Sequence, residues 1–491
     1  MKDSLIIALD QGTSSCRAVL VDGSGKIMGI AQKEFTQYFP ESDWVEHDAQ
    51  EIWSVQMEVL DQLIEEHVED ITRITGIGIT NQRETTVVWD KRTGIPIYRA
   101  IVWQDKRTSK YCQQLKNEGF DKVVTPATGL PIDPYFSGTK LRWILQNTGA
   151  EIEHLCFGTI DTWLIWKMTE GASHVTDYTN ASRTLLYNIQ NLEWDKTILD
   201  KFEIPESILP SVQSSASHFG TYTIQGHDIP IAGVAGDQQA ALFGQACVEK
   251  GMAKNTYGTG CFMLMNVGED YVASENGLLT TLCCNRDGGV AYALEGSIFV
   301  AGAAVQWLRD GISIIEDSTE TEQMAKNVAE SEEVIVVPAF AGLGAPYWNM
   351  DSRGAIFGLT RAVTREHLIK GTLDGIAYRT KDVLDAMVKD SGSPLDILRV
   401  DGGACRNEYL MQFQSSILDT TVERPVTIES TALGAAYLAG MTVGIWDSGT
   451  INRNRVVDKQ FEPDMTNEKR ERLYQQWQKA IARTIDWKSS E

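Results

Sequence analysis

The sequence predicts an α/β protein of two similar domains that face each other across a central cleft. The chain has 491 residues, which is more than one hydrophobic core usually serves, so two domains are the default. Its first part reads as a meander of short strands followed by alternating helices and strands, the pattern of a mixed α/β fold. The second half repeats this plan. We therefore expect a boundary near residues 245–251, giving domains of residues 1–247 and 248–491.

The elements of the first domain follow from apolar runs and the turn residues between them. Asp48-Ala-Gln-Glu51 has the form of a capping box that opens an amphipathic helix. The buried stripe of this helix is expected to include Trp53, Met57, Leu60 and Ile64. The expected strands are residues 5–9, 17–21, 26–32, 74–80, 86–89 and 229–234.

The second domain echoes the first. Tyr257-Gly-Thr-Gly260 forms a turn between two expected strands, as Gln11-Gly-Thr13 does in the first domain. This internal repeat is weak and is visible in the plan more than in residue identity. The expected strands are residues 252–255, 262–266, 291–294 and 397–400, and a charged surface helix is expected at residues 467–487.

Composition excludes several classes of protein. The formal net charge of -23 argues against a nucleic-acid partner, which needs clustered Lys and Arg, but it leaves ATP binding open. No apolar run approaches the length of a membrane span or of a signal-peptide core. The 8 cysteines form no CxxC pair, so we expect buried, reduced thiols in a cytoplasmic protein.

The turn after the first strand has the composition of a phosphate-binding loop. Asp10-Gln-Gly-Thr-Ser-Ser-Cys-Arg17 offers backbone N–H groups, hydroxyls and a guanidinium to an anion. Asp10 could hold Mg²⁺, which prefers carboxylate and water oxygens. An ordinary tight turn with a solvated aspartate fits the local residues equally well. The loop lacks the Gly-Lys-Ser/Thr ending of a Walker A element.

Asp237 follows the strand at residues 229–234, at the expected carboxyl edge of a sheet, where α/β proteins commonly bind ligands. Two interpretations are open for this residue. It can accept a proton from a substrate hydroxyl, or it can cap the helix that follows. The local sequence favours the cap, and the two roles can coexist.

Two further groups of residues are candidates for ligand binding. Arg83 and Glu84 could bind neighbouring hydroxyls of a small polyol, with Trp103, Tyr135 and Phe262 around its carbon edge. The ordinary alternative is a surface ion pair with core aromatics. In the second domain, the glycine-rich segments Gly302-Ala-Ala-Val-Gln306 and Gly402-Gly-Ala-Cys-Arg-Asn407 would let an adenine or a ribose approach the backbone.

Together these segments resemble the carbohydrate kinases that share the actin-like ATPase fold, and among them the glycerol kinases. The resemblance extends over essentially the whole chain. Its most specific segments are Ala8-Leu-Asp-Gln-Gly-Thr13, Thr80-Asn-Gln-Arg-Glu-Thr85, Ala235-Gly-Asp-Gln-Gln-Ala-Ala-Leu-Phe-Gly-Gln245, Asn255-Thr-Tyr-Gly-Thr-Gly-Cys-Phe262 and Val400-Asp-Gly-Gly403. Tyr135-Phe-Ser-Gly-Thr-Lys-Leu-Arg-Trp143 and Thr431-Ala-Leu-Gly-Ala-Ala-Tyr-Leu-Ala-Gly440 are similar to the two signatures of the wider family.

The resemblance implies two ribonuclease-H-like domains that close on their substrates. It implies transfer of a phosphoryl group from ATP to glycerol, giving sn-glycerol 3-phosphate and ADP, the first step of glycerol catabolism. Asp237 would be the base and Asp10 the magnesium partner. The glycerol site would consist of Arg83, Glu84, Trp103, Tyr135, Asp237, Gln238 and Phe262. The ATP site would consist of Thr13, Ser14, Ser15, Arg17, Thr259, Gly302, Gln306, Gly403 and Asn407. Homodimers or homotetramers are usual in such proteins.

Two alternatives stay open: a related kinase acting on another polyol, a pentulose or gluconate, and an actin-like ATPase that transfers no phosphate to an acceptor. The chain also departs from its relatives. Cys16 stands where relatives commonly have Ser. Residues 217–230 lack the His-Phe-Tyr-Gly segment that is phosphorylated in some relatives. The Gly-Gly-Arg-type loop that binds a sugar bisphosphate in others is also missing, so neither form of regulation is expected.

Overall fold

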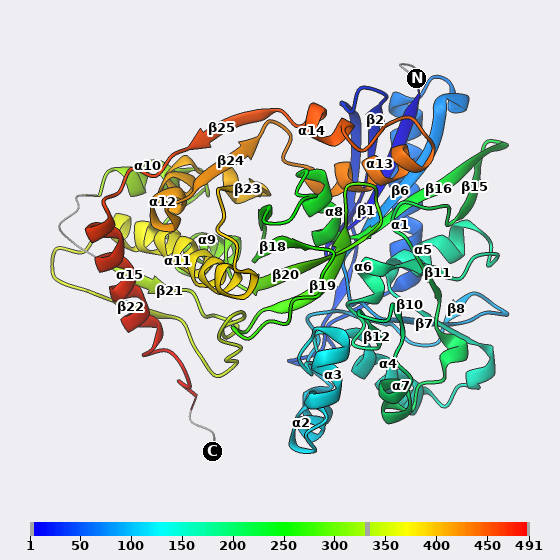
Figure 1. The fold of residues 1–491 in the computed structure, drawn as a ribbon, viewed down its shortest axis with the longest axis horizontal. Helices are drawn as coiled ribbons and strands as arrows, with labels where there is room; N and C mark the ends of the chain where they lie inside the picture. Colours follow the sequence, from blue (N-terminus) through cyan, green and yellow to red (C-terminus); the bar gives the residue numbers. More distant parts are fainter. Residues whose placement is uncertain (1–3, 329–333, 489–491) are drawn as a thin grey trace.

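The computed structural model describes residues 4–328 and 334–488, and two large mixed β-sheets organise it (Figure 1). The first sheet has the strand order β15-β16-β6-β1-β2-β3, and the second β19-β20-β18-β17-β23-β24-β25. The expectation of an α/β protein with two similar domains is confirmed. The residue at which the first domain ends stays a prediction.

The strands of the first sheet are β1 (Leu5–Gln11), β2 (Ser15–Asp22), β3 (Ile27–Glu34), β6 (Ile74–Asn81), β15 (Gly220–Ile224) and β16 (His227–Gly236). Those of the second are β17 (Ala253–Tyr257), β18 (Cys261–Gly268), β19 (Leu279–Cys284), β20 (Val290–Ile298), β23 (Ile397–Asp401), β24 (Thr421–Pro425) and β25 (Val457–Phe461). All of the expected strands are present, with residues 86–89 found as β7 (Val87–Asp90) outside the two large sheets, and most are one to five residues longer than the apolar run that predicted them.

The internal repeat is clearer in topology than in sequence. In the first sheet β1 is antiparallel to β2 and parallel to β6, and β6 is parallel to β16. In the second sheet β17 is antiparallel to β18 and parallel to β23, and β23 is parallel to β24. The β1–β2 turn and the β17–β18 turn therefore occupy equivalent places in the two domains.

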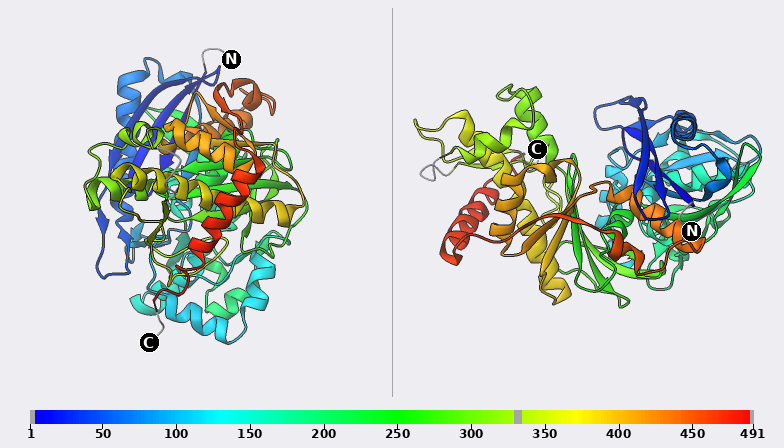
Figure 2. Two further views of the ribbon diagram at one scale, coloured as in Figure 1. Left: turned by 90° about the vertical axis from the view of Figure 1, so that its left-hand side faces the viewer. Right: turned by 90° about the horizontal axis from the view of Figure 1, so that it is seen from above.

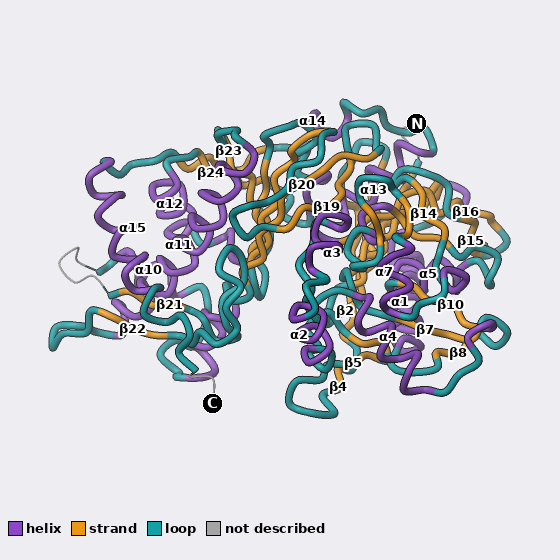
Figure 3. The backbone as a smooth tube through the Cα atoms, turned by 60° about the horizontal axis from the view of Figure 1, so that its bottom comes forward, coloured by secondary structure: helices purple, strands orange, loops and turns teal. Residues whose placement is uncertain are grey.

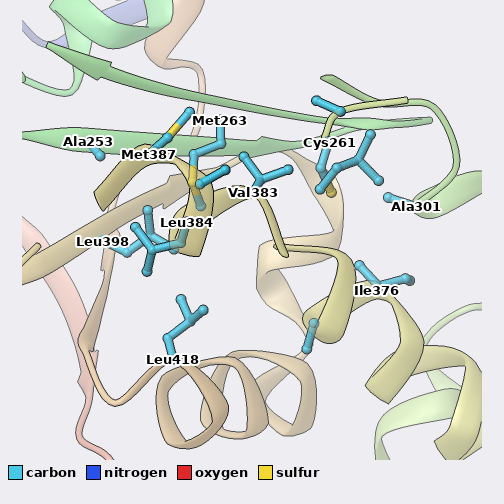
Figure 4. Close-up of a cluster of buried hydrophobic side chains, with 14 of the residues drawn as sticks. Ala253, Cys261, Met263, Ala301, Ile376, Val383, Leu384, Met387, Leu398 and Leu418 are labelled. Carbon is cyan, nitrogen blue, oxygen red and sulfur yellow. The ribbon is translucent and has the colours of Figure 1, made fainter. Parts of the chain in front are cut away.

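Helices pack against both sheets, as the views in Figures 2 and 3 show. In the first domain α1 (Ala49–His67) packs on one face and α13 (Ser430–Thr442) on the other. In the second domain α11 (Arg365–Ser391) packs on β18 and β20, with Val383 and Met387 beside Met263 (Figure 4). The remaining helices are α2 (Ser109–Asn117), α3 (Asp121–Thr128), α4 (Ser137–Thr148), α5 (Ile160–Met168), α6 (Tyr178–Ala181), α7 (Lys196–Phe202), α8 (Asp237–Gly244), α9 (Gly302–Gln306), α10 (Glu320–Lys326), α12 (Glu408–Leu418), α14 (Thr450–Asn454) and α15 (Asn467–Ile481).

Helix α13 comes late in the sequence yet packs on the first sheet and on α8 (Figure 1). Glycines make this contact very close. A Cβ added to Gly434 would lie 1.9 Å from the carbonyl oxygen of Ala240 in α8, and one added to Gly78 of β6 would lie 2.2 Å from that of Ala435. The α13 segment thus joins the second half of the chain to the sheet of the first domain.

Some local expectations differ in detail. Asp48 caps α1 by accepting from the backbone N–H groups of Gln50 and Glu51, but the Glu51 carboxylate accepts from Thr36 instead of completing a capping box. Trp53 and Met57 are only partly buried, because they flank the stripe that includes Leu60 and Ile64. Helix α15 ends at Ile481, earlier than expected.

All eight cysteines are buried and unpaired, as expected. Within the part of the chain that the structure describes, no helix combines the length and the apolar character needed to cross a bilayer.

The α8–α13 contact predicts that Gly434→Ala destabilises the protein. The new methyl group has no space beside Ala240, so the two helices must separate, at a cost of about 1–3 kcal/mol or more. Thermal unfolding measures the loss. Gly403→Ala is the matched control, because a Cβ at Gly403 meets no atom within 4 Å. Equal melting temperatures for the two variants would contradict the close packing of the helices.

His47 predicts a pH-dependent contribution to stability. It lies in the short strand β5 (Glu46–His47), fully buried, and burial lowers its pKa to about 3. An unfolded histidine has a pKa of about 6.5, so this contribution is complete above pH 6.5 and is lost as the pH falls from there toward 3. Between about pH 7.5 and pH 5 the wild-type protein should lose about 2 kcal/mol more stability than His47→Gln. Denaturant unfolding at the two pH values checks this; identical losses would refute it.

Candidate active site

The predicted phosphate-binding loop is the turn between β1 and β2. Asp10 pairs in register with Arg17 across the hairpin, and the backbone N–H of Gly12 donates to the carbonyl of Ser15. Thr13, Ser14 and Ser15 are partly or fully exposed, so their hydroxyls are accessible to a ligand. The loop therefore has the accessible donors that an anion requires.

Two residues of this loop, Arg17 and Cys16, also make contacts with distant parts of the chain. Arg17 forms an ion pair with Glu429, a residue from the other end of the chain, at 2.5 Å. The Cys16 side chain is fully buried and faces the carbonyl of Ile52 in α1. Because Cys16 points into the core, its replacement of the serine of relatives leaves the exposed hydroxyls of the loop in place.

Asp10, the next-to-last residue of β1, carries a buried carboxylate. Burial raises its pKa to about 6; Arg17 opposes this shift, while the negative charges of Asp237 and Glu429 add to it. The Oδ2 atom of Asp10 lies 3.8 Å from the Arg17 guanidinium. Asp10 and Asp237 are close enough for their charges to interact, and few groups donate a hydrogen bond to the Asp10 carboxylate. Such a pair of carboxylates is suited to a hard divalent cation such as Mg²⁺.

Asp237 lies at the same edge of the sheet as Asp10. β1 and β16 both run parallel to β6, and Asp10 and Ala235 are both in register with Thr80. Gly236 is the N-cap of α8, so Asp237 is its first helical residue and not its cap. Its Oδ1 accepts from the backbone N–H of Gln238 at 2.7 Å, and its side chain is 31% exposed.

Arg83 lies directly beside this carboxylate. Its Nε is 3.2 Å from Oδ1 of Asp237, and its two terminal nitrogens donate to the Glu295 carboxylate at 2.6 and 2.9 Å. One of them also donates to the side chain of Gln239. A Cβ at Gly236 would lie 2.7 Å from the Arg83 side chain, which explains the glycine at that position.

Glu84 is buried next to Arg83 and has a φ of 61°, a conformation uncommon outside glycine. The Nε of Arg183 donates to its carboxylate at 2.6 Å. Burial raises the pKa of Glu84, while Arg183 and Arg83 oppose the shift. The expected Arg83–Glu84 pair is therefore part of a buried cluster and not a surface ion pair.

Sequence reasoning missed two members of this cluster, Arg183 and Glu295. Arg183 follows α6, and Glu295 lies in β20 of the second sheet. Although burial alone would raise the pKa of Glu295, Arg183 and Arg83 lower it to about 2. The one available signal was a carboxylate within the otherwise apolar or small residues of Val290–Ile298.

The three expected aromatic residues meet. The Trp103 ring centroid is 5.6 Å from that of Tyr135 and 6.4 Å from that of Phe262, both edge to face. Phe262 comes from β18 of the second sheet, whereas Trp103 and Tyr135 lie in loops of the first half of the chain, so both halves of the chain contribute to this wall. The Trp103 indole N–H donates to the Thr13 hydroxyl at 3.1 Å, which ties the aromatic wall to the predicted phosphate-binding loop.

The second domain brings part of the expected nucleotide site together. The carbonyl of Thr259, in the β17–β18 turn, accepts from the backbone N–H groups of Ala301 and Ala303, and Gly302 donates to the carbonyl of Gly258. A Cβ at Gly302 would lie 2.5 Å from that carbonyl oxygen. Glycine at position 302 thus lets α9 begin against the exposed turn.

The other expected nucleotide residues lie on adjoining elements. Gly403 is exposed just after β23, and Gln306 is exposed at the end of α9. Asn407 is the N-cap of α12: its side-chain oxygen accepts from the backbone of Leu410, and its amide donates to Thr321. Its polar atoms are therefore already engaged in holding α12 and α10 together.

Comparison with known proteins gives a consistent result over the whole chain. Residues 5–244 match the N-terminal domain of the FGGY family of carbohydrate kinases, and residues 253–443 match its C-terminal domain. A glycerol kinase of Halorhodospira halophila is 57% identical over 495 residues, which covers 99% of this chain and 98% of that protein.

Solved structures agree. The structure of Plasmodium falciparum glycerol kinase with ADP is 38% identical and covers 98% of each chain, with a TM-score of 0.90. A gluconate kinase of Lactobacillus acidophilus covers 98% of this chain and 97% of its own, with a TM-score of 0.86, but at 21% identity it is similar in fold alone. The chain belongs to the FGGY family of carbohydrate kinases and has their two-domain, actin-like ATPase fold.

Proposed function

We propose that this protein phosphorylates glycerol at a terminal hydroxyl, using ATP and producing sn-glycerol 3-phosphate and ADP. The observation that carries the proposal is the position of Asp237, a partly exposed carboxylate between Arg83 and Gln238 at the sheet edge that also holds Asp10. The full-length similarity to proteins named glycerol kinase supports it.

The acceptor site fits a small polyol. Arg83 and Glu84 would bind neighbouring hydroxyls as donor and acceptor. Trp103, Tyr135 and Phe262 would pack against the carbon chain, and Gln238 would lie beside Asp237. The buried ion pairs of Arg83 and Glu84 fix both side chains before the acceptor arrives, which lowers the cost of ordering the site.

Asp237 would act as the general base. As the terminal hydroxyl oxygen of glycerol forms a bond to the γ-phosphorus of ATP, the bond to the bridging oxygen breaks and ADP leaves. The hydroxyl proton passes to the Asp237 carboxylate. Positioning and electrostatic stabilisation supply nearly all of the rate in such reactions.

The phosphate groups would be bound from both domains. Thr13, Ser14, Ser15 and Arg17 would contact them from the first domain and Thr259 from the second. Gly302, Gln306, Gly403 and Asn407 would line the rest of the nucleotide site. Asp10 fits a Mg²⁺ partner, and bound Mg²⁺ would neutralise charge on the phosphoryl oxygens. For Asn407 we propose contact with the nucleotide through a change in its present hydrogen bonds.

Assembly and compartment are also proposed from the family resemblance. We propose a homodimer or homotetramer that works in the cytoplasm as part of glycerol catabolism. Sedimentation velocity of the purified protein would test the assembly, and a monomer at micromolar concentration would refute it.

Acceptor specificity is the direct test of the function. In an assay that couples ADP release to a detectable reaction, glycerol should give a kcat/KM at least about 100-fold above xylulose or gluconate, because a site rejects acceptors whose extra polar groups stay unpaired. Preference for either larger acceptor would overturn the assignment. ATP hydrolysis at an equal rate without any acceptor would favour the actin-like ATPase alternative.

Asp237→Asn should remove glycerol phosphorylation while leaving ATP affinity nearly unchanged. The amide keeps the shape of the side chain but cannot accept the proton, so kcat should fall by about 10²–10⁴. Single-turnover kinetics measure the transfer step, and calorimetry measures ATP binding. A variant that keeps substantial turnover would remove Asp237 from the role of base.

A further inference from the structure

Lys254 is a fully buried lysine whose side chain ends beside the site. It lies on β17 of the second domain, and its Nζ donates to the side-chain oxygen of Gln238 at 2.6 Å and to the Thr256 hydroxyl at 2.7 Å. Among the described residues it forms no direct ion pair with a carboxylate. A buried ammonium group without such a pair is costly, so its presence calls for an explanation.

The hydrogen bonds of Lys254 determine which way the Gln238 amide faces. An ammonium group has donors only, so the oxygen of the amide must point to Lys254. The amide nitrogen then points the other way and donates to Oδ2 of Asp237, at 3.2 Å. Lys254, Gln238 and Asp237 form one directed chain of hydrogen bonds from the second domain to the proposed base.

Nearby carboxylates favour the protonated form of Lys254 in spite of its burial. Burial lowers its pKa to about 8, while Asp401 on β23, Asp237 on α8 and Glu295 on β20 favour the charged form and Arg83 opposes it. The ammonium form therefore predominates at neutral pH. A charged donor polarises the amide and strengthens the hydrogen bond that the amide donates to the carboxylate.

We propose that Lys254 is a positioning residue for phosphoryl transfer, which acts through Gln238 to hold the Asp237 carboxylate toward the acceptor hydroxyl. This inference rests on the proposed function. It makes the orientation of a base in the first domain depend on a side chain of the second. Oδ1 of Asp237 is held by Arg83 and Oδ2 by Gln238, so both oxygens have a fixed direction.

Lys254→Met tests the proposal, because it removes the charge and the hydrogen-bond donor and keeps an unbranched side chain only one atom shorter. We expect kcat for glycerol to fall by about 10- to 100-fold, the range for losing one hydrogen bond to a charged group. The KM for glycerol should change by less than about threefold, because Arg83 and Glu84 still bind the acceptor. Lys370→Met, which removes a partly buried ammonium paired with Asp374 on α11, is the matched control and should keep wild-type kcat.

A double-mutant cycle with Gln238→Met shows whether Lys254 acts through Gln238. The double variant should be no slower than the slower single variant, within about twofold, because both changes break the same chain. Losses that multiply would overturn the proposal. So would a Lys254→Met variant with more than half the wild-type kcat.

Gln238→Glu covers the case in which Lys254→Met fails to fold. The new carboxylate gains an ion pair with Lys254 but cannot donate to Asp237, so the folded variant should lose kcat while its melting temperature is kept. Wild-type kcat in Gln238→Glu would overturn the proposal. If the wild-type protein itself does not phosphorylate glycerol, the proposed function fails, an outcome separate from all of these.

Discussion

The Arg83 guanidinium is the group on which the geometry of the site depends. It is buried where the two domains meet, with a bidentate ion pair to Glu295 of the second sheet and its Nε against Asp237 of the first domain. Bidentate pairing fixes the plane of a guanidinium as well as its position. The direction in which Asp237 is held thus follows from a contact between domains.

The buried cluster of two arginines and two glutamates around Arg83 contributes more to the orientation of side chains in the site than to the stability of the protein. Burying an ion pair rarely stabilises a protein relative to apolar residues of the same size, because both charges lose their hydration. Arg83, Arg183, Glu84 and Glu295 balance in charge and bond to one another, which limits that loss. The same contacts hold Glu84 at a positive φ, a strained state that persists only where its surroundings determine it fully.

The features that could be predicted from the sequence are those determined by residues close together in the chain. The β1–β2 turn and the position of Asp237 follow from local patterns of apolar, glycine and polar residues, and both are where they were expected. The local sequence favoured Asp237 as the helix cap. In the structure Gly236 is the N-cap of α8, and the Asp237 carboxylate faces Arg83 instead. Glu295 pairs with a residue 212 positions away, and no short-range pattern carries such a contact. The packing of α13 could not be predicted for the same reason. It brings Gly78 against the carbonyl of Ala435 and Gly434 against that of Ala240, and both contacts join residues far apart in the sequence.

The aromatic wall contains residues of both domains, and this affects whether water can reach the proposed transfer site. Trp103 touches Phe262 of the second domain and also donates to Thr13 in the β1–β2 turn. The aromatic wall of the proposed acceptor site is therefore complete only when both domains contribute to it, and its completion is tied to the loop proposed to bind the phosphates. Water is a competing acceptor in phosphoryl transfer, and an apolar wall that forms together with the phosphate site excludes it when the reactive groups meet. A single aromatic contact between domains can in this way link binding of the nucleotide to protection of the transfer step.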